Sequence, residues 1–139
     1  MSEKLERLGQ LLTSKFGERL KAVVTACGEV TAIVSATDYL GVARMLRDDP
    51  ELGFEQLVDL SGLDYSTFSG VRPERRFAVS AHLLSVRNNY RLRLRAFADD
   101  DFFPVLDSLC DVWPGVNWFE REAFDLYGVM FNGHPDLRR

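Results

Sequence analysis

Apolar and basic residues alternate without a break in the stretch YRLRLRA. Successive side chains of a strand point to opposite faces of a sheet, so Arg91, Arg93 and Arg95 would share one face and the apolar residues the other. An apolar run at 76–86 and a turn at 87–89 complete a hairpin, because asparagine tolerates the positive φ of a tight turn. The pattern predicts a sheet with one packed face and one face left to water or to a partner.

Two further segments carry the three- to four-residue apolar spacing of amphipathic helices. The apolar face of the first consists of Leu5, Leu8, Leu12 and Phe16. This helix should end at Gly17. The second could be capped by Ser35 or Thr37 and should stop before Pro50. Its buried stripe would consist of Tyr39, Val42, Ala43 and Leu46.

The remaining apolar runs predict mostly strands. Runs at 20–26 and 29–34, separated by a Cys-Gly turn, favour a hairpin, and FEQLVDLSGLDYS favours a strand that continues into a loop. Residues 102–109 are compatible with a short helix. The order α-β-β-α-β-β-β predicts a single two-layer α+β domain over residues 1–139, with a mostly antiparallel or mixed sheet of about five strands and helices on one face.

Composition indicates an ordinary globular chain. Apolar residues make up 46% and aromatic residues 12% of the chain, and the formal net charge is −4, so neither disorder nor nucleic-acid binding is favoured. The N-terminal decapeptide lacks the apolar core of a signal peptide, and no apolar run approaches the roughly 20 residues of a membrane helix. We expect a cytoplasmic chain without direct membrane insertion.

The sequence contains two cysteines, Cys27 and Cys110, which are too few for a disulfide framework. With His82 and His134 they provide four soft ligands, the number that a zinc site uses, but no pair has the spacing of a zinc motif. Both cysteines have apolar neighbours in the sequence. We therefore expect reduced thiols in the core and no metal site.

The closing segment, residues 117–139, combines aromatic and charged residues. On a helix from Trp118 to Tyr127, the apolar arc consists of Phe119, Ala123, Phe124, Leu126 and Tyr127. The opposite face consists of Trp118, Arg121, Glu122 and Asp125. Arg121 and Asp125 could form an ion pair. Glu120 falls inside the apolar arc, so it must lie at a rim, find a cationic partner or join a buried polar network.

Gly128 should end this helix in the left-handed conformation. A short strand at 129–131 and a turn at Asn132-Gly133 should follow, after which HPDLRR leaves the domain.

Three functional readings of the closing segment compete with a plain amphipathic helix. An acid–base site could use Glu120, Glu122, Asp125 and His134, but the helical positions separate Glu120 from the other two acids and no motif completes the site. The tripeptide that starts at His134 occurs in J-domains, but there it joins two helices. The density of tryptophan, tyrosine and arginine, which carry interface energy, favours a docking segment.

The closing stretch NWFEREAFDLYGVMFNGHPDLRR closely resembles the signature of the C subunit, or thirty-kilodalton subunit, of proton-pumping NADH:quinone oxidoreductase, respiratory complex I. The matching positions are Trp118, Glu120, Arg121, Glu122, Asp125, Gly128, Gly133, His134, Pro135, Asp136, Leu137, Arg138 and Arg139. The stretches LVDLSGLDY and HLLSVRNNYRLRLR agree with the family as well. Family chains usually continue past the second arginine, and often have a tyrosine where this sequence has Ser80 and Ala81.

The resemblance implies a structural, peripheral subunit on the cytoplasmic side of the bacterial inner membrane. Flavin (FMN) and iron–sulfur clusters in partner subunits of that complex carry electrons from NADH to quinone, coupled to proton translocation. The expected partners are the D (quinone-site) subunit, the I subunit and the NADH-side module. No cofactor is expected in this chain, and two cysteines are too few for a cluster.

The resemblance and the helical pattern together predict a partner interface and no catalytic, cofactor or metal residues in this chain. The interface residues would be Trp118, Glu120, Arg121, Glu122, Asp125, Tyr127, His134, Pro135, Asp136, Leu137, Arg138 and Arg139. Glu120 would be half-buried and paired with an arginine of the hairpin or of the exit segment. Arg91, Arg93 and Arg95 would form either a solvated face or a second contact.

Two alternatives remain at this point. One is the equivalent subunit of a related membrane-bound hydrogenase or dehydrogenase complex. The other is a small acid–base enzyme, which would need an enclosed pocket lined by Glu122, Asp125 and His134.

Overall fold

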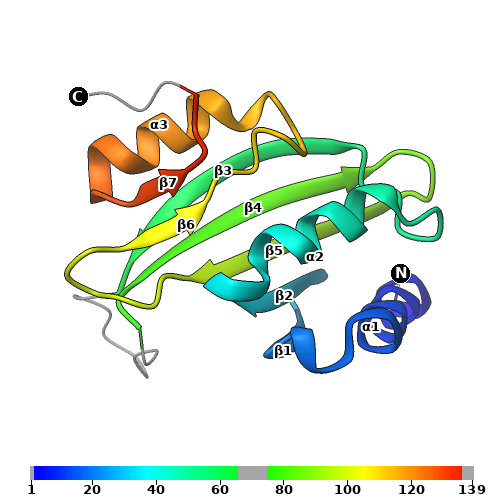
Figure 1. The fold of residues 1–139 in the computed structure, drawn as a ribbon. Coiled ribbons are helices and arrows are strands. Elements are labelled where there is room, and N and C mark those ends of the chain that lie inside the picture. Colours follow the sequence, from blue (N-terminus) through cyan, green and yellow to red (C-terminus); the bar gives the residue numbers. More distant parts are fainter. Residues whose placement is uncertain (1, 66–74, 136–139) are drawn as a thin grey trace.

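The computed structural model describes residues 2–65 and 75–135. Five strands form one sheet in the order β1-β2-β5-β4-β3, and two more form a small separate sheet (Figure 1). The strands are β1 (Ala22–Ala26), β2 (Glu29–Ser35), β3 (Gln56–Asp64), β4 (Phe77–Ser85), β5 (Tyr90–Phe97), β6 (Val105–Asp107) and β7 (Met130–Asn132). The helices are α1 (Ser2–Phe16), the 3-10 turn η1 (Gly17–Arg19), α2 (Ala36–Asp48) and α3 (Val116–Tyr127).

The main sheet is mixed, because β2 pairs with β5 in parallel and the other neighbouring strands are antiparallel. In this register Leu94 of β5 lies beside Ala32 of β2 and Ala81 of β4, so apolar side chains of three strands gather on one face. The apolar members of the β5 alternation are all buried, namely Tyr90, Leu92, Leu94 and Ala96. Asn89 has φ 57° in the β4–β5 turn, as the tight turn requires. The α+β class with a mixed sheet is confirmed.

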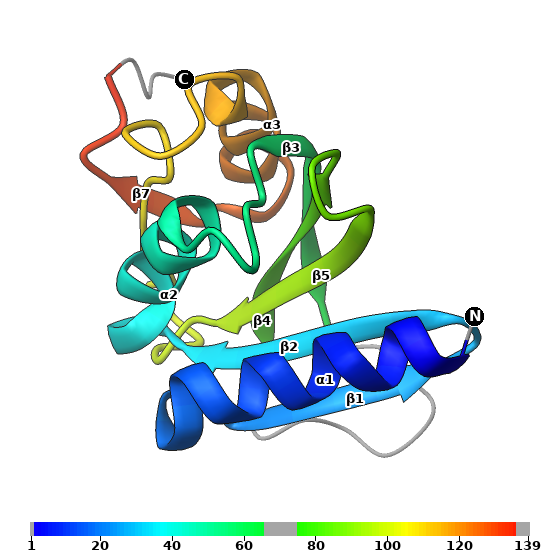
Figure 2. The same ribbon diagram turned by 90° about the vertical axis from the view of Figure 1, so that its right-hand side faces the viewer.

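The helices contribute their apolar stripes to the core of the main sheet. α1 runs along β1 and β2 (Figure 2), whereas α3 lies against β3 at the other edge of the sheet. The stripe predicted for α2 is fully buried, namely Tyr39, Val42, Ala43 and Leu46. Ser35, not Thr37, occupies the N-cap position, although its side chain makes no capping hydrogen bond. Among the described residues, no helix has the length and apolar character that crossing a membrane requires.

The helix predicted at residues 102–109 is wrong. Residues up to Pro104 form a loop, and β6 follows, pairing in parallel with β7. Pro104 disfavours helical geometry at Phe103, and the Asp100 carboxylate accepts the backbone N–H groups of Phe102 and Phe103 in a local turn. The spacing of residues 102–109 could not indicate a strand here, because the partner strand β7 follows α3 in the chain.

Candidate functional site

The closing helix α3 is held in place by contacts at both of its ends. Before the helix, buried Trp113 donates its indole N–H to the carbonyl of Phe54, at 3.0 Å. At its C-terminal end, the ring of Tyr127 lies over Gly62 of β3, where a β-carbon would come within 2.6 Å of the ring. Gly128 then ends the helix with φ 73°, as predicted. α3 therefore has a defined inner and outer side.

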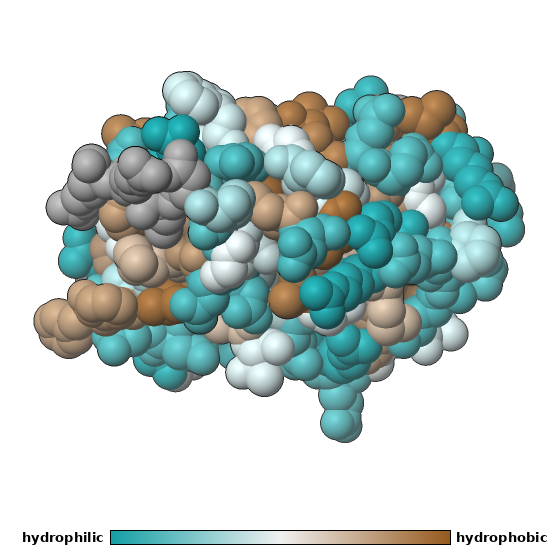
Figure 3. Space-filling view, turned by 45° about the horizontal axis from the view of Figure 1, so that its top comes forward, coloured by the Kyte–Doolittle hydropathy of each residue, from teal (hydrophilic) through white to brown (hydrophobic). Residues whose placement is uncertain are grey.

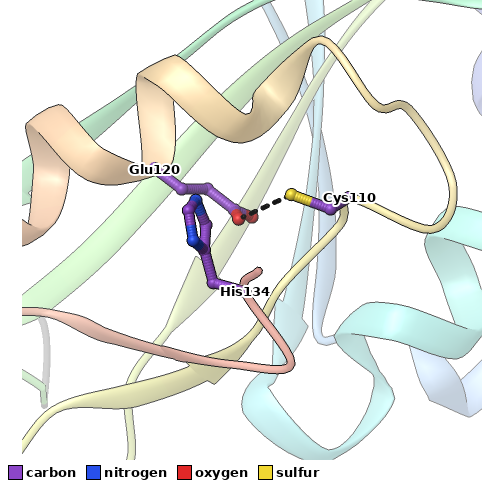
Figure 4. Close-up of side chains that lie close together, drawn as sticks. All are labelled: Cys110, Glu120 and His134. Carbon is purple, nitrogen blue, oxygen red and sulfur yellow. Dashed lines mark hydrogen bonds between the residues drawn. The ribbon is translucent and has the colours of Figure 1, made fainter. Parts of the chain in front are cut away.

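On the inner side, Glu120 is fully buried. Its carboxylate accepts hydrogen bonds from the Ser108 hydroxyl at 2.6 Å and from the Leu109 backbone N–H at 2.8 Å. The Cys110 thiol lies 3.6 Å from the same carboxylate (Figure 4). Burial raises the pKa of Glu120, while these donors and the nearby charge of His134 act in the opposite direction. A buried polar network is thus the solution that the fold adopts.

This arrangement corrects three expectations for Glu120. It is not half-buried at a rim, and a fully buried side chain presents no surface to a partner. None of the described arginines of the β4–β5 hairpin bonds to it; its partners come from the segment between β6 and α3. Arg138 and Arg139 lie outside the described residues, as do Asp136 and Leu137.

Cys110, Glu120 and His134 form a compact cluster that the sequence spacing did not reveal. Their potential ligand atoms all lie within 4.8 Å of one another, and thiolate, carboxylate and imidazole are groups that can bind zinc. However, both Glu120 oxygens already accept hydrogen bonds, and burial raises the pKa of the Cys110 thiol, which favours the protonated form that does not bind metal. His134 lies 3.1 Å from the Asn117 carbonyl through its Nε2 atom. The geometry therefore describes a hydrogen-bonded polar cluster.

Sequence reasoning missed other parts of this cluster. Ser108 is buried and also accepts the backbone N–H of Cys110, at 3.1 Å. Tyr39, which the spacing identified as a core residue, is close enough to Glu120 that burial and the carboxylate charge together raise the pKa of its hydroxyl well above the usual range. No local signal links these positions, because they come from α2, the β6–α3 connection and α3. The other cysteine, Cys27, is exposed in the β1–β2 turn, so its prediction as a core thiol is wrong.

The outer side of α3 carries the predicted polar face. Trp118 is 62% exposed, Glu122 and Asp125 are exposed, and Arg121 is half-buried. The Arg121–Asp125 ion pair that the spacing permits is not formed: within the described part of the chain, neither residue forms a salt bridge. The face therefore offers a tryptophan and three charged side chains without ionic partners in the described chain.

The three arginines of β5, Arg91, Arg93 and Arg95, differ in their contacts. Arg93 donates to Nε2 of His82, at 3.2 Å, and pairs with Glu29, while Nδ1 of His82 lies 2.6 Å from Asp59. Because Nε2 accepts from arginine, the proton of the imidazole belongs on Nδ1, facing the aspartate. A polar row thus crosses four neighbouring strands. Arg93 is engaged within the chain, whereas Arg91 is exposed and Arg95 is half-buried without a salt bridge to another described residue.

Glu122, Asp125 and His134 do not line one enclosed pocket, as a small acid–base enzyme would need. Glu122 and Asp125 are exposed on the outer side of α3, while His134 is placed beside Glu120 on the inner side. Two surface hollows of the described chain are lined by other residues, one near the start of β5 and one near the loop before β6. The carboxylates and the imidazole therefore do not converge on one reacting atom.

Known proteins are similar to this chain in both sequence and fold. The pattern of the family described as "Respiratory-chain NADH dehydrogenase, 30 Kd subunit" matches residues 32–139. The C subunit of NADH-quinone oxidoreductase from Azoarcus sp. (strain BH72) is 62% identical over 100% of this chain and 70% of its own length. That of Cupriavidus pinatubonensis (strain JMP 134 / LMG 1197) is 61% identical over 98% of this chain and 69% of its own length.

Solved structures agree with the described fold. The trypsin-resistant fragment (1-134) of Nqo5 superposes with a TM-score of 0.80 at 28% identity, covering 96% of this chain and 99% of the fragment. A chain of the membrane-bound sulfane sulfur reductase, an archaeal respiratory membrane complex, superposes with a TM-score of 0.73 at 17% identity, over 93% of this chain and 71% of its own, which shows the shared fold alone. The chain therefore belongs to the thirty-kilodalton subunit family of respiratory-chain NADH dehydrogenase, which comprises the C subunits of NADH-quinone oxidoreductase, complex I.

Proposed function

We propose that this chain is a structural, cofactor-free subunit of complex I that docks partner subunits on the cytoplasmic side of the bacterial inner membrane. Electrons would pass from NADH to quinone through flavin and iron–sulfur clusters of those partners. The chain's two cysteines support this division of labour, because Cys27 lies in an exposed turn and Cys110 in the Glu120 cluster, and an iron–sulfur cluster needs more thiolate ligands. The D subunit is the principal partner, with the I subunit and the NADH-side module nearby.

The composition and exposure of the outer side of α3 are the main support for this proposal. An exposed tryptophan beside Arg121, Glu122 and Asp125 combines a large apolar surface with charges that have no ionic partner in the described chain. Tryptophan and arginine are enriched among the residues that dominate interface energies. Structural needs do not account for these residues, because the inner side of the same helix already supplies the contacts with the core.

The segment after β7 extends this surface. The His134 ring is anchored to the carbonyl of Asn117, which is the residue next to Trp118, so the chain leaves the domain beside the first turn of α3. Pro135 is exposed there. Residues 136–139, which the sequence also assigns to the interface, lie outside the described residues. On β5, Arg91 and Arg95 remain candidates for a second contact with an acidic surface, because only Arg93 of the three is occupied.

Binding to the D subunit of the same complex tests the proposal. The two chains are co-expressed and analysed on a sizing column, and the dissociation constant is measured for the parent and for Arg121→Ala, Glu122→Ala and Trp118→Ala. We expect each substitution at the interface to weaken binding about tenfold or more. Trp118→Ala removes a large apolar contact, and truncating Arg121 or Glu122 leaves the partner of a buried polar contact unpaired. Urea unfolding should show that the variants remain folded.

Arg44→Ala is the matched control, since Arg44 is an exposed arginine on the helix α2. It should bind like the parent. If Trp118→Ala, Arg121→Ala and Glu122→Ala all bound like Arg44→Ala, the outer side of α3 would not be the docking surface.

A further inference from the structure

The loop between β5 and β6 exposes two adjacent phenylalanines. Phe102 is 98% exposed and Phe103 is 65% exposed. Figure 3 shows hydrophobic atoms projecting at its left edge, on the side where Figure 1 places this loop. Burying one phenylalanine side chain is worth about 1.5–3 kcal/mol, so two rings left in water indicate a surface with another purpose.

The loop is held in this form by hydrogen bonds on both sides. Asp100 accepts the backbone N–H groups of Phe102 and Phe103, at 2.8 and 3.2 Å. The Asp101 carboxylate accepts the backbone N–H of Arg76, at 2.8 Å. The carbonyl of Pro104 accepts the N–H of Met130 from β7, at 2.9 Å. Because the backbone is already ordered, little entropy would be lost when a partner covers the rings.

An apolar hollow continues the surface behind these rings. It has a volume of about 610 Å³, and its lining includes Phe102, Phe103, Pro104, Tyr127 and Met130. Tyr127 and Met130 are themselves 37% and 36% exposed. We name Phe102, Phe103, Tyr127 and Met130 the Phe102 patch. It lies at the C-terminal end of α3, whereas Trp118 lies in the first turn of that helix.

The sequence that carries the two rings of the Phe102 patch is acidic. Residues 96–120 contain six acidic residues and neither lysine nor arginine. Asp99, Asp100 and Asp101 directly precede the two rings, and none of them forms a salt bridge in the described part of the chain. Arg76, which also lines the hollow, is already paired with Asp64, at 2.8 and 3.0 Å. A complementary partner must bring apolar side chains together with lysine or arginine.

We propose that the Phe102 patch and its three aspartates form a second docking surface, which takes a segment of another complex I subunit with apolar side chains flanked by lysine or arginine. The two phenylalanines insert into that segment as anchors, and the aspartates set its orientation and speed its association. This surface is separate from the outer side of α3. The proposal of a second surface rests on the chain's membership of the complex and does not require contact with the D subunit.

Photo-crosslinking in the assembled complex tests which kind of segment covers the loop. Phe102 is replaced by p-benzoylphenylalanine, the complex is purified and irradiated, and the crosslinked peptide is identified by mass spectrometry. We expect one apolar segment of another subunit with adjacent lysine or arginine. The same label at Val86, which is 62% exposed in the turn between β4 and β5, provides the background. Crosslinking no higher than at Val86, or to an acidic or uncharged segment, or to a second copy of this chain, would overturn the proposal.

Variants separate this proposal from the docking by α3. Phe102→Ser with Phe103→Ser should leave at least tenfold less chain in the purified complex after a wash in moderate salt, while Val86→Ser should match the parent. Asp99→Lys should slow association several-fold and reduce its dependence on salt. If the double serine variant assembled like the parent and Arg121→Ala did not, the Phe102 patch would be wrong and the α3 surface would stand; the reverse pattern would retain only the patch.

Discussion

The N-terminal two thirds of the chain and its closing third use charged residues in different ways. Every salt bridge between described residues joins positions up to Arg93, as in the row Asp59–His82–Arg93–Glu29 and in the pair Arg76–Asp64. From position 95 to position 135, no arginine, aspartate or glutamate forms a salt bridge with another described residue, although α3 displays three such side chains on its outer side. Salt bridges between described residues are thus confined to the first region, and the charged side chains on the outer side of α3 form none.

Within the closing third, the two sides of α3 differ just as clearly. Glu120 is tied to neutral donors on the inner side, and Glu122, two residues later, is exposed on the outer side. The same type of side chain thus has a structural role at one position and is available to a partner at the other. Substitutions at matched positions can break or sharpen this contrast.

The largest effect is expected at Glu120. Glu120→Ala leaves the Ser108 hydroxyl and the Leu109 N–H buried without an acceptor, and each such loss costs about 1–3 kcal/mol. We expect the free energy of unfolding in urea to fall by about 3 kcal/mol. Glu122→Ala is the control and should change it by less than about 0.5 kcal/mol. Equal stabilities for the two variants would contradict the assignment of an inner and an outer side.

A smaller loss is expected where α3 contacts the sheet. Gly62→Ala would place a β-carbon 2.6 Å from the Tyr127 ring, so the ring or the helix must shift. Overpacking of this kind costs about 1–3 kcal/mol, and we expect about 2 kcal/mol in thermal or urea unfolding. Adding Tyr127→Ala should recover part of the loss, because it removes the clashing ring. Additive losses in the double variant would show that this contact does not position α3.

The pH dependence of stability should reveal the buried carboxyl. Because burial raises the pKa of Glu120 above its ordinary value of 4.5, the folded state keeps a proton that the unfolded state releases above that value. Stability should therefore fall as pH rises from about 4.5 to the raised folded pKa.

Glu120→Gln should remove this component, since glutamine does not titrate and can still accept the Leu109 N–H. Urea unfolding is compared for the two proteins from about pH 4.5 to 7.5. Parallel stability profiles would argue against a raised pKa. The nearby His134 opposes the effect, because its charge lowers the pKa of Glu120.

The smallest effect is expected for a pair of glutamate substitutions, one in each region. Glu29→Gln removes the partner of Arg93, and an ion pair this exposed is worth about 0.5 kcal/mol at low salt. Glu122→Gln, which removes no salt bridge of the described chain, should leave stability unchanged. The difference should disappear in about 1 M salt, where exposed charges are screened. A loss at Glu122 equal to that at Glu29 would mean that the outer side of α3 is also satisfied within the chain.

Local patterns predicted most of the fold. The alternation in β5, the stripe of α2, the Cys-Gly and Asn turns and the end of α3 at Gly128 all agree with the structure. The errors arose where a distant partner decides the outcome. Residues 105–107 are a strand because β7 lies beside them, and Arg121 does not pair with Asp125 although their spacing permits it.

The site was predictable only in part, for the same reason. Periodicity placed Glu120 in the apolar arc of its helix and demanded a solution for its charge. It could not identify that solution, because the donors of Ser108 and Leu109 and the neighbours Cys110 and His134 come from outside the helix. The exposed Phe102 and Phe103 were likewise assigned to a helix, so only the structure revealed their display on an anchored loop.

By itself, then, the sequence determined the family, the order of most elements and the buried sides of β5 and α2, because these depend on motifs and on short-range periodicity. The apolar arc predicted for α3 was only partly right, since Leu126 is 73% exposed. Tertiary structure alone decided which charges are satisfied within the chain and which remain for partners. That distinction depends on which distant segments meet, and a hydrogen bond or an ion pair exists only when both of its groups are brought within a few ångströms.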